Sequence, residues 1–216
     1  MARIILLSHL MDGNTPLYGG EDRVEMVQGK SIKSGDSCNT MRLSMTNHAG
    51  THVDMPRHFF EKGATVSDMP PEGWVFDRIT LVEVPSGPGE SVIGPDLLEE
   101  PVDCELLLIR TGMEKFRNEK TYIQGSPVIL PELADWIKSK CPSIKAVGID
   151  TISISSLNDR VMGRKAHKAF LEKGIILVED MKLSGVGHVP DRVIVAPLML
   201  KDADAAPVTV FGFSYV

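Results

Sequence analysis

Three largely apolar segments most constrain how this 216-residue chain can fold. The run at residues 104–110 contains Leu106-Leu107-Leu108-Ile109, and such a run is typical of a strand that is buried on both faces. Two further strands are expected at 144–149 and 175–178, and they end beside Asp150 and Glu179. The sequence therefore predicts a sheet with polar side chains at its strand ends.

Shorter patterns supply the remaining elements. Strands are expected at 4–10 (buried), 24–27, 38–46, 79–84, 193–200 and 208–216, and helices at 131–140 and 164–173. In the strand at 38–46, Met41, Leu43 and Met45 alternate with polar residues, which predicts a half-buried strand. Strands outnumber helices, so we expect an α/β fold around a mostly β core. No linker or repeat divides the chain, which predicts one domain over residues 1–216.

Composition excludes several classes of function. The net charge is −6 and no basic run occurs, which argues against a nucleic-acid surface. The three cysteines are scattered, so neither a disulfide framework nor a cysteine zinc site is expected, and a reduced cytoplasmic compartment fits. The N-terminal apolar run is too short for a signal peptide, and no stretch approaches a membrane-spanning length.

The stretch His48-Ala-Gly-Thr-His-Val-Asp-Met-Pro-Arg-His58 holds three of the six histidines and a carboxylate. Imidazole and carboxylate form a ligand set for Zn²⁺, and also for Mn²⁺ or Fe²⁺. In an extended segment His52 and Asp54 point to the same side, and His48 can fold in across Gly50. Three ligands leave positions for water and substrate, as in a catalytic metal site. The alternative is that these are ordinary loop histidines, but three histidines and one aspartate within eleven residues disfavour it.

His58 follows the three candidate ligands after a proline. It is either a fourth ligand or a free imidazole, and we favour the free imidazole as a general base and acid.

Two later residues are candidates for the same site. His167 lies beside the apolar face of the helix at 164–173, where a lone histidine is usually a core residue. Glu179 closes an apolar strand and needs a partner there, and a metal ion is one such partner. Asp180 should point to the opposite face. Arg110 is expected in a structural ion pair, and Asp150 behind the site.

The pattern His-x-Gly-Thr-His-x-Asp-x-Pro-x-His resembles the signature of the cyclase-like metal-dependent hydrolases, which include bacterial arylformamidases (kynurenine formamidases) and isatin hydrolases. By this resemblance, His48, His52 and Asp54 are metal ligands and His58 transfers protons. His167 and Glu179 match the residues that complete a two-metal site in the formamidases. Tyr18 stands where formamidases carry a tryptophan against the substrate ring.

The resemblance implies the swivelling β/β/α arrangement, a homodimer or homotetramer, and one or two Zn²⁺ per chain, with Mn²⁺ as the alternative. It implies hydrolysis of a small amide, most simply an arylformamide such as N-formylkynurenine. Opening of a cyclic amide such as isatin is one alternative, and a non-catalytic metal-binding or ligand-binding protein is another. Two departures concern the substrate pocket: Tyr18 replaces tryptophan, and residues 151–155 lack the proline and aspartate of the formamidase pattern Thr-Pro-Ser-x-Asp.

Overall fold

The computed structural model describes residues 2–20, 22–89 and 91–215. Its main sheet follows the order β5-β12-β13-β4-β11-β10-β8-β6, and β1 also pairs with β13. These strands are β1 (Ala2–Leu6), β4 (His52–Asp54), β5 (Val75–Phe76), β6 (Ile79–Glu83), β8 (Leu106–Arg110), β10 (Ala146–Ile149), β11 (Ile176–Glu179), β12 (Arg192–Pro197) and β13 (Ala205–Tyr215).

The sheet has two halves with different strand directions. Strands β6, β8, β10 and β11 are parallel, whereas β4, β13, β12 and β5 pair antiparallel. The three-residue strand β4 joins the halves, because it pairs with β11 on one side and β13 on the other. Any side chain of β4 is therefore held between the two halves.

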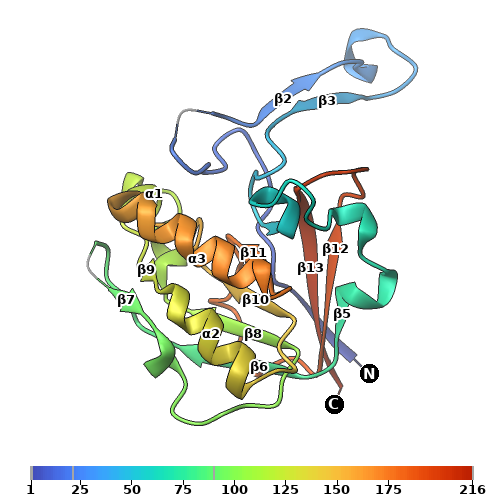
Figure 1. Ribbon diagram of the computed structural model, residues 1–216. Coiled ribbons are helices and arrows are strands. Elements are labelled where there is room, and N and C mark those ends of the chain that lie inside the picture. The colour runs from blue at the N-terminus through green and yellow to red at the C-terminus, as the bar shows by residue number, and fades with distance from the viewer. Residues whose placement is uncertain (1, 21, 90, 216) are drawn as a thin grey trace.

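Two helices cover one face of the parallel half (Figure 1). They are α2 (Pro131–Lys140) and α3 (Arg160–Glu172), and a short helix α1 (Lys120–Gln124) precedes them. Leu107 and Ile109 of β8 pack in the core beneath the helices, while Leu106 and Leu108 join the core on the other face. The prediction of a strand buried on both faces is confirmed, as is the mostly β core with few helices.

Short elements complete the described chain. They are the strands β2 (Glu25–Gln28), β3 (Met41–Ser44), β7 (Val92–Ile93) and β9 (Val128–Ile129), and the 3₁₀ turns η1 (Ile32–Ser34), η2 (Pro56–His58), η3 (Val66–Asp68), η4 (Pro71–Trp74), η5 (Pro95–Leu97), η6 (Met113–Phe116) and η7 (Leu157–Asp159). Of the helices described, none combines the length and apolar character that crossing a membrane requires.

Two predictions about burial were wrong. Strands β2 and β3 form a hairpin that projects from the body (Figure 1), and Met41 and Leu43 are 63% and 46% exposed. The alternation in β3 is real, but no described part of the chain covers its apolar face. The buried strand expected at 4–10 ends at Leu6, and Ile4 is exposed because no part of the described chain covers its side of β1.

Helix α3 begins four residues before its predicted start. The side chain of Asp159 accepts a hydrogen bond from the backbone N–H of Met162 and caps the helix. Gly163 lowers the helix propensity of the first turn of α3, and for this reason the sequence pattern predicted a later start. Glycine is nevertheless required at this position, because an added Cβ would collide with the side chain of Ser155.

Candidate metal centre

The backbone brings the candidate ligands together from three elements. The register of β4 against β11 sets His52 opposite Glu179, and His52 and Asp54 point to the same side of β4. His167 approaches from the helix α3 that packs over this part of the sheet. Gly50, with a positive φ of 63°, turns the chain so that His48 reaches the same place.

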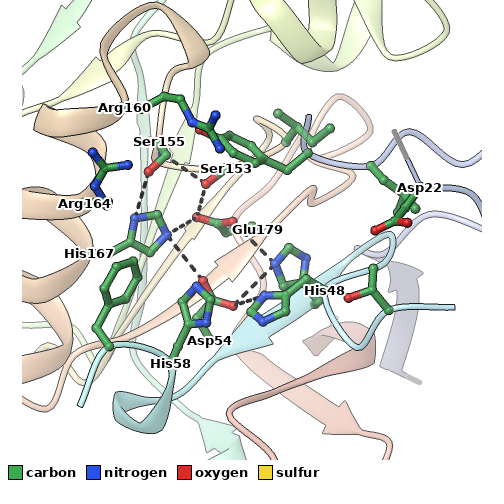
Figure 2. A pocket seen from close by; sticks show the side chains of 16 residues that line it. Asp22, His48, Asp54, His58, Ser153, Ser155, Arg160, Arg164, His167 and Glu179 are labelled. Atoms are coloured by element: carbon green, nitrogen blue, oxygen red, sulfur yellow. Dashed lines mark hydrogen bonds and ion pairs between the residues drawn. The ribbon is translucent and has the colours of Figure 1, made fainter. Parts of the chain in front are cut away.

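Four of these side chains form a closed ring of facing ligand atoms, and Figure 2 labels three of them, Asp54, His167 and Glu179. His52 Nε2 lies 3.4 Å from Asp54 Oδ1 and 3.5 Å from Glu179 Oε2. His167 Nε2 lies 3.4 Å from Asp54 Oδ2 and 3.3 Å from Glu179 Oε1. Each carboxylate thus offers one oxygen to each imidazole, and all four residues are buried.

Hydrogen bonds to backbone carbonyls set the tautomer of both imidazoles. His52 Nδ1 lies 2.9 Å from the carbonyl oxygen of Gly50, and His167 Nδ1 lies 2.9 Å from that of Gly163. A carbonyl oxygen only accepts, so each Nδ1 carries the proton and each Nε2 turns toward the carboxylates. Metal-binding histidines are held in this way in most proteins.

The residues present fit a divalent metal ion. Asp54 Oδ1 is buried and, within the described residues, has no hydrogen-bond partner, although His48 Nδ1 lies 3.0 Å away. Donors bound at about 2.0–2.1 Å in tetrahedral geometry around Zn²⁺ lie about 3.3–3.4 Å apart. The nitrogen–oxygen distances of the ring, 3.3–3.5 Å, match this spacing. The imidazole and carboxylate donor set suits Zn²⁺ and Mn²⁺.

Without a metal, protons must balance the buried carboxylates. Burial alone would lower the pKa of His52, but Glu179 and Asp54 raise it to about 9. Burial would also lower the pKa of His167, but Asp54 and Glu179 outweigh this effect and raise the pKa to about 10. Burial and the Asp54 charge would raise the pKa of Glu179, but hydrogen bonds from His167 and His52 lower it to about 2. Both imidazoles are therefore protonated at neutral pH in the metal-free protein.

Asp204 is a site residue that sequence reasoning missed. Its Oδ1 accepts a hydrogen bond from Asn47 Nδ2 at 2.7 Å, and its Oδ2 lies 3.0 Å from His48 Nε2 and 2.9 Å from His58 Nδ1. It directly precedes β13, whose Ala205 pairs with Asp54. The sequence offers Asp202 and Asp204 two residues apart, and only the register of β13 distinguishes them.

His58 lies at the edge of the ligand ring on the turn η2. Its ring centroid is 4.3 Å from that of His48 and 4.6 Å from that of Phe59. Asp204 holds its Nδ1, which leaves Nε2 for another partner. Ligand atoms of His48, Asp54 and His58 also lie within 4.8 Å of one another, so both interpretations of His58 remain geometrically possible.

A cavity of about 300 Å³ opens over the ring. Tyr18 is half-buried and lines this cavity. Sequence reasoning did not single out Asp22, Arg160 and Arg164, which also line the cavity, whereas Ser153 and Ser155 belong to the segment 151–155 noted above. Ser153 Oγ and the Ile154 N–H donate to Glu179 Oε1 at 3.1 and 2.7 Å, so the segment that departs from the formamidase pattern holds this carboxylate.

The remaining polar candidates lie outside the cavity. Asp150 accepts hydrogen bonds from the backbone N–H groups of Thr111 and Gly112 and so fixes a neighbouring loop. Arg110 pairs with Glu83. Asp180 points away from Glu179 and accepts two hydrogen bonds from Arg117, at 2.8 and 2.6 Å.

Comparison with known proteins adds independent findings. Residues 5–156 match the Cyclase family model. The chain is 31% identical over 203 residues to a kynurenine formamidase of Bacillus thuringiensis (strain Al Hakam). This alignment covers 94% of this chain and 93% of that protein. Isatin hydrolase A from Labrenzia aggregata, solved with benzyl benzoate, superposes with a TM-score of 0.83 at 21% identity, covering 99% of this chain and 94% of that one.

A second isatin hydrolase, bound to the product analogue thioisatinate, gives a TM-score of 0.86 at 15% identity, with 100% of this chain and 93% of that chain covered. At these identities the two structures establish a shared fold. The family match, the coverage of the formamidase relative and the shared fold agree: this chain belongs to the Cyclase family.

Proposed function

We propose that this protein is a metal-dependent amide hydrolase and that its substrate is an arylformamide of the N-formylkynurenine type. The observation that carries the proposal is the buried ring of two imidazoles and two carboxylates, with both Nε2 atoms turned inward. The similarity to kynurenine formamidases over most of the chain supports the choice of a carbon–nitrogen bond outside a peptide.

The metal ligands in this proposal are His48, His52, Asp54, His167 and Glu179. Zn²⁺ is the proposed ion, one or two per chain, and Mn²⁺ is the alternative. When bound, a divalent metal polarises a carbonyl oxygen and lowers the pKa of water toward neutrality.

His58 moves the proton in this reaction. Asp204 keeps the proton on Nδ1 of His58, so Nε2 is free to accept one. Nε2 takes a proton from the attacking water and returns it to the leaving nitrogen, which departs as an amine while the formyl group leaves as formate. Tyr18 lines the cavity wall and packs against the aryl ring of the substrate.

The first experiment measures metal content and N-formylkynurenine turnover on the same preparation. His58→Ala should keep its metal and lose about 10²–10⁴-fold in kcat. His188→Ala, an exposed histidine that does not line the cavity, is the matched control and should keep full activity. Loss of metal from His58→Ala would make His58 a ligand instead.

Other outcomes would change the assignment. Turnover of isatin without turnover of any arylformamide would indicate cyclic-amide opening. Bound metal with neither activity would indicate a binding protein on the same fold. Failure to bind Zn²⁺ or Mn²⁺ in any preparation would refute the metal centre and the mechanism together.

We also propose that the protein assembles as a homodimer or homotetramer through the β2–β3 hairpin. A two-stranded hairpin is at best marginally stable alone in water, yet this one exposes Met26, Val27, Met41 and Leu43. Burial against a second copy would stabilise it. Light scattering should report a larger mass for the native chain than for Leu43→Glu. The control is Val92→Glu, which alters an exposed apolar residue on β7.

A further inference from the structure

Two arginines stand on the cavity-lining face of helix α3. Arg160, Arg164 and His167 are spaced by four and three residues, so they share one side of the helix. All three line the cavity. Figure 2 shows both guanidinium groups beside Ser155 and His167, and Asp22 on the opposite side of the ligand ring. The helix therefore presents a buried imidazole and, toward its N-terminus, two cations at the cavity opening.

Neither guanidinium is neutralised by a carboxylate of the described residues (2–20, 22–89 and 91–215). Five other arginines, by contrast, pair with acidic side chains; these are Arg23, Arg78, Arg110, Arg117 and Arg192. Like charges four residues apart on a helix repel each other. The ring of Tyr18, 5.9 Å from the Arg160 guanidinium carbon, provides an aromatic face but no negative charge. An anion bound between the two arginines would remove this repulsion.

The charges around the cavity also define where an anion can bind. Asp54 and Glu179 lie at the base of the cavity in the proposed metal centre, and Asp22 lines the opposite wall. Asp22 repels a substrate carboxylate from its wall, the two arginines attract it on theirs, and the proposed metal at the base takes the reacting amide group instead. Guanidinium groups bind carboxylates through paired, charge-assisted hydrogen bonds of defined direction. The arrangement therefore both recognises an anion and orients the group attached to it.

We propose that Arg160 and Arg164 bind a carboxylate of the substrate, and that the enzyme thereby selects amides that carry a carboxylate over neutral amides with the same reacting group. This inference rests on the proposed amide hydrolysis, because it concerns the same cavity. N-formylkynurenine meets the requirement, since its α-carboxylate lies at the end of the acyl side chain on the ring position next to the formamide. A neutral cyclic amide such as isatin does not meet it.

The kinetic test compares three substrates that share one formamide and one aryl ketone. They are N-formylkynurenine, 4-(2-formamidophenyl)-4-oxobutanoate, which keeps the carboxylate but lacks the ammonium group, and the neutral 2′-formamidoacetophenone. Arg160→Gln and Arg164→Gln should each lower kcat/KM for the two substrates that carry a carboxylate by about tenfold or more, because each removes a charge-assisted hydrogen bond. The neutral substrate should change less than about twofold.

Lys165→Gln is the matched control. It removes one positive charge between the two arginines in sequence, from an exposed residue that does not line the cavity. It should leave all three rates unchanged. Raising the salt concentration should slow only the anionic substrates, and this dependence should disappear in the double variant Arg160→Gln/Arg164→Gln. Equal loss for anionic and neutral substrates would refute the inference.

A binding measurement separates this inference from the proposed function. Calorimetry on the metal-loaded protein compares the products kynurenine and 2′-aminoacetophenone. Tighter binding of kynurenine by at least about tenfold, lost in the double variant, supports the anion site even if no formamide is hydrolysed. Hydrolysis of all three formamides with equal affinity for both products would refute the anion site and leave the proposed function intact.

Discussion

Replacing Asp204 with asparagine tests whether this residue controls the proton on His58. The substitution preserves the shape of the side chain but removes the charge that faces His58 Nδ1 at 2.9 Å and His48 Nε2 at 3.0 Å. An asparagine can present its NH₂ group to His58, which then carries its proton on the wrong nitrogen. We therefore expect kcat to fall by about 10–100-fold, as for other partners that orient site histidines.

The effect on stability should be smaller than the effect on kcat and should disappear in acid. Partial burial would raise the pKa of Asp204, but hydrogen bonds from His58, Asn47 and His48 lower it from 3.8 to about 2. At about 1.4 kcal/mol per pKa unit the full shift corresponds to roughly 2 kcal/mol. The side chain is one-third exposed, so screening reduces this to about 1 kcal/mol. A lowered carboxyl pKa stabilises above about pH 4, and this gain is lost as pH falls toward 2, so the cost of Asp204→Asn should shrink in acid.

A double-mutant cycle gives the decisive assay. In the His58→Ala background, Asp204→Asn should lower kcat by less than about threefold, because the histidine that Asp204 orients is already absent. Metal content should stay at the native level when metal is in excess. Asp202→Asn, which alters an exposed aspartate two residues away, is the control and should be silent. Full activity of Asp204→Asn, or additive losses in the double variant, would refute this reasoning.

Three further predictions concern the metal centre and its support. Loading the metal-free protein with Zn²⁺ at pH 8 should release protons, because His52 and His167, with pKa values of about 9 and 10, must lose a proton to bind the ion. The heat of binding measured by calorimetry should then depend on the ionisation enthalpy of the buffer. Gly163→Ala should lower the free energy of unfolding in urea by about 1–3 kcal/mol, because its new Cβ collides with the neighbouring loop. Asp180→Asn should cost about 3–5 kcal/mol by leaving Arg117 buried without a counter-ion.

The two structural predictions each have a control in the same chain. Gly185→Ala places a Cβ in open space and should be nearly neutral. Asp77→Asn breaks an exposed ion pair with Arg192 and should cost less than about 1 kcal/mol. Buffer-independent heats would refute the proton release, and urea midpoints equal to those of the controls would refute the two structural predictions.

The pH dependence of the metal-free protein follows from the same raised pKa values. A histidine whose pKa rises on folding stabilises the fold fully below its unfolded value near 6.5, and this stabilisation is lost as pH rises through the folded value. For His52 and His167 that window extends from about pH 6.5 to about 9 and 10. The chelated protein should therefore melt at a lower temperature at pH 9.5 than at pH 7.

Local patterns predicted the parts of the fold that local physics determines. The helix at residues 131–140 matches α2, with Pro131 in its first turn, and the run at 104–110 is buried on both faces. The apolar alternation of β3 also occurs, but burial depends on a covering surface that no described residue provides. Periodicity specifies which face of a strand is apolar and cannot specify what covers that face.

The candidate site likewise has one part that the local sequence predicts and another part that only the fold brings together. The ligand types in His48–His58 are dense enough to indicate a metal centre before any fold is known. His167 and Glu179 were weak candidates as single residues, and helix packing brings them to the ring. Asp204 lies 146 residues from His58 in sequence, and no local pattern connects them.

The position of the centre at the junction of the two sheet halves couples folding to metal binding. Strand β4 contributes two proposed ligands, β11 and α3 contribute one each, and the residue before β13 orients the histidines. Without metal, four buried ionisable groups must be held together by protons on two imidazoles. A divalent ion that replaces these protons binds only after β4 has paired on both sides. Its binding free energy therefore adds to the stability of the whole sheet, so that removing the metal should weaken the junction first.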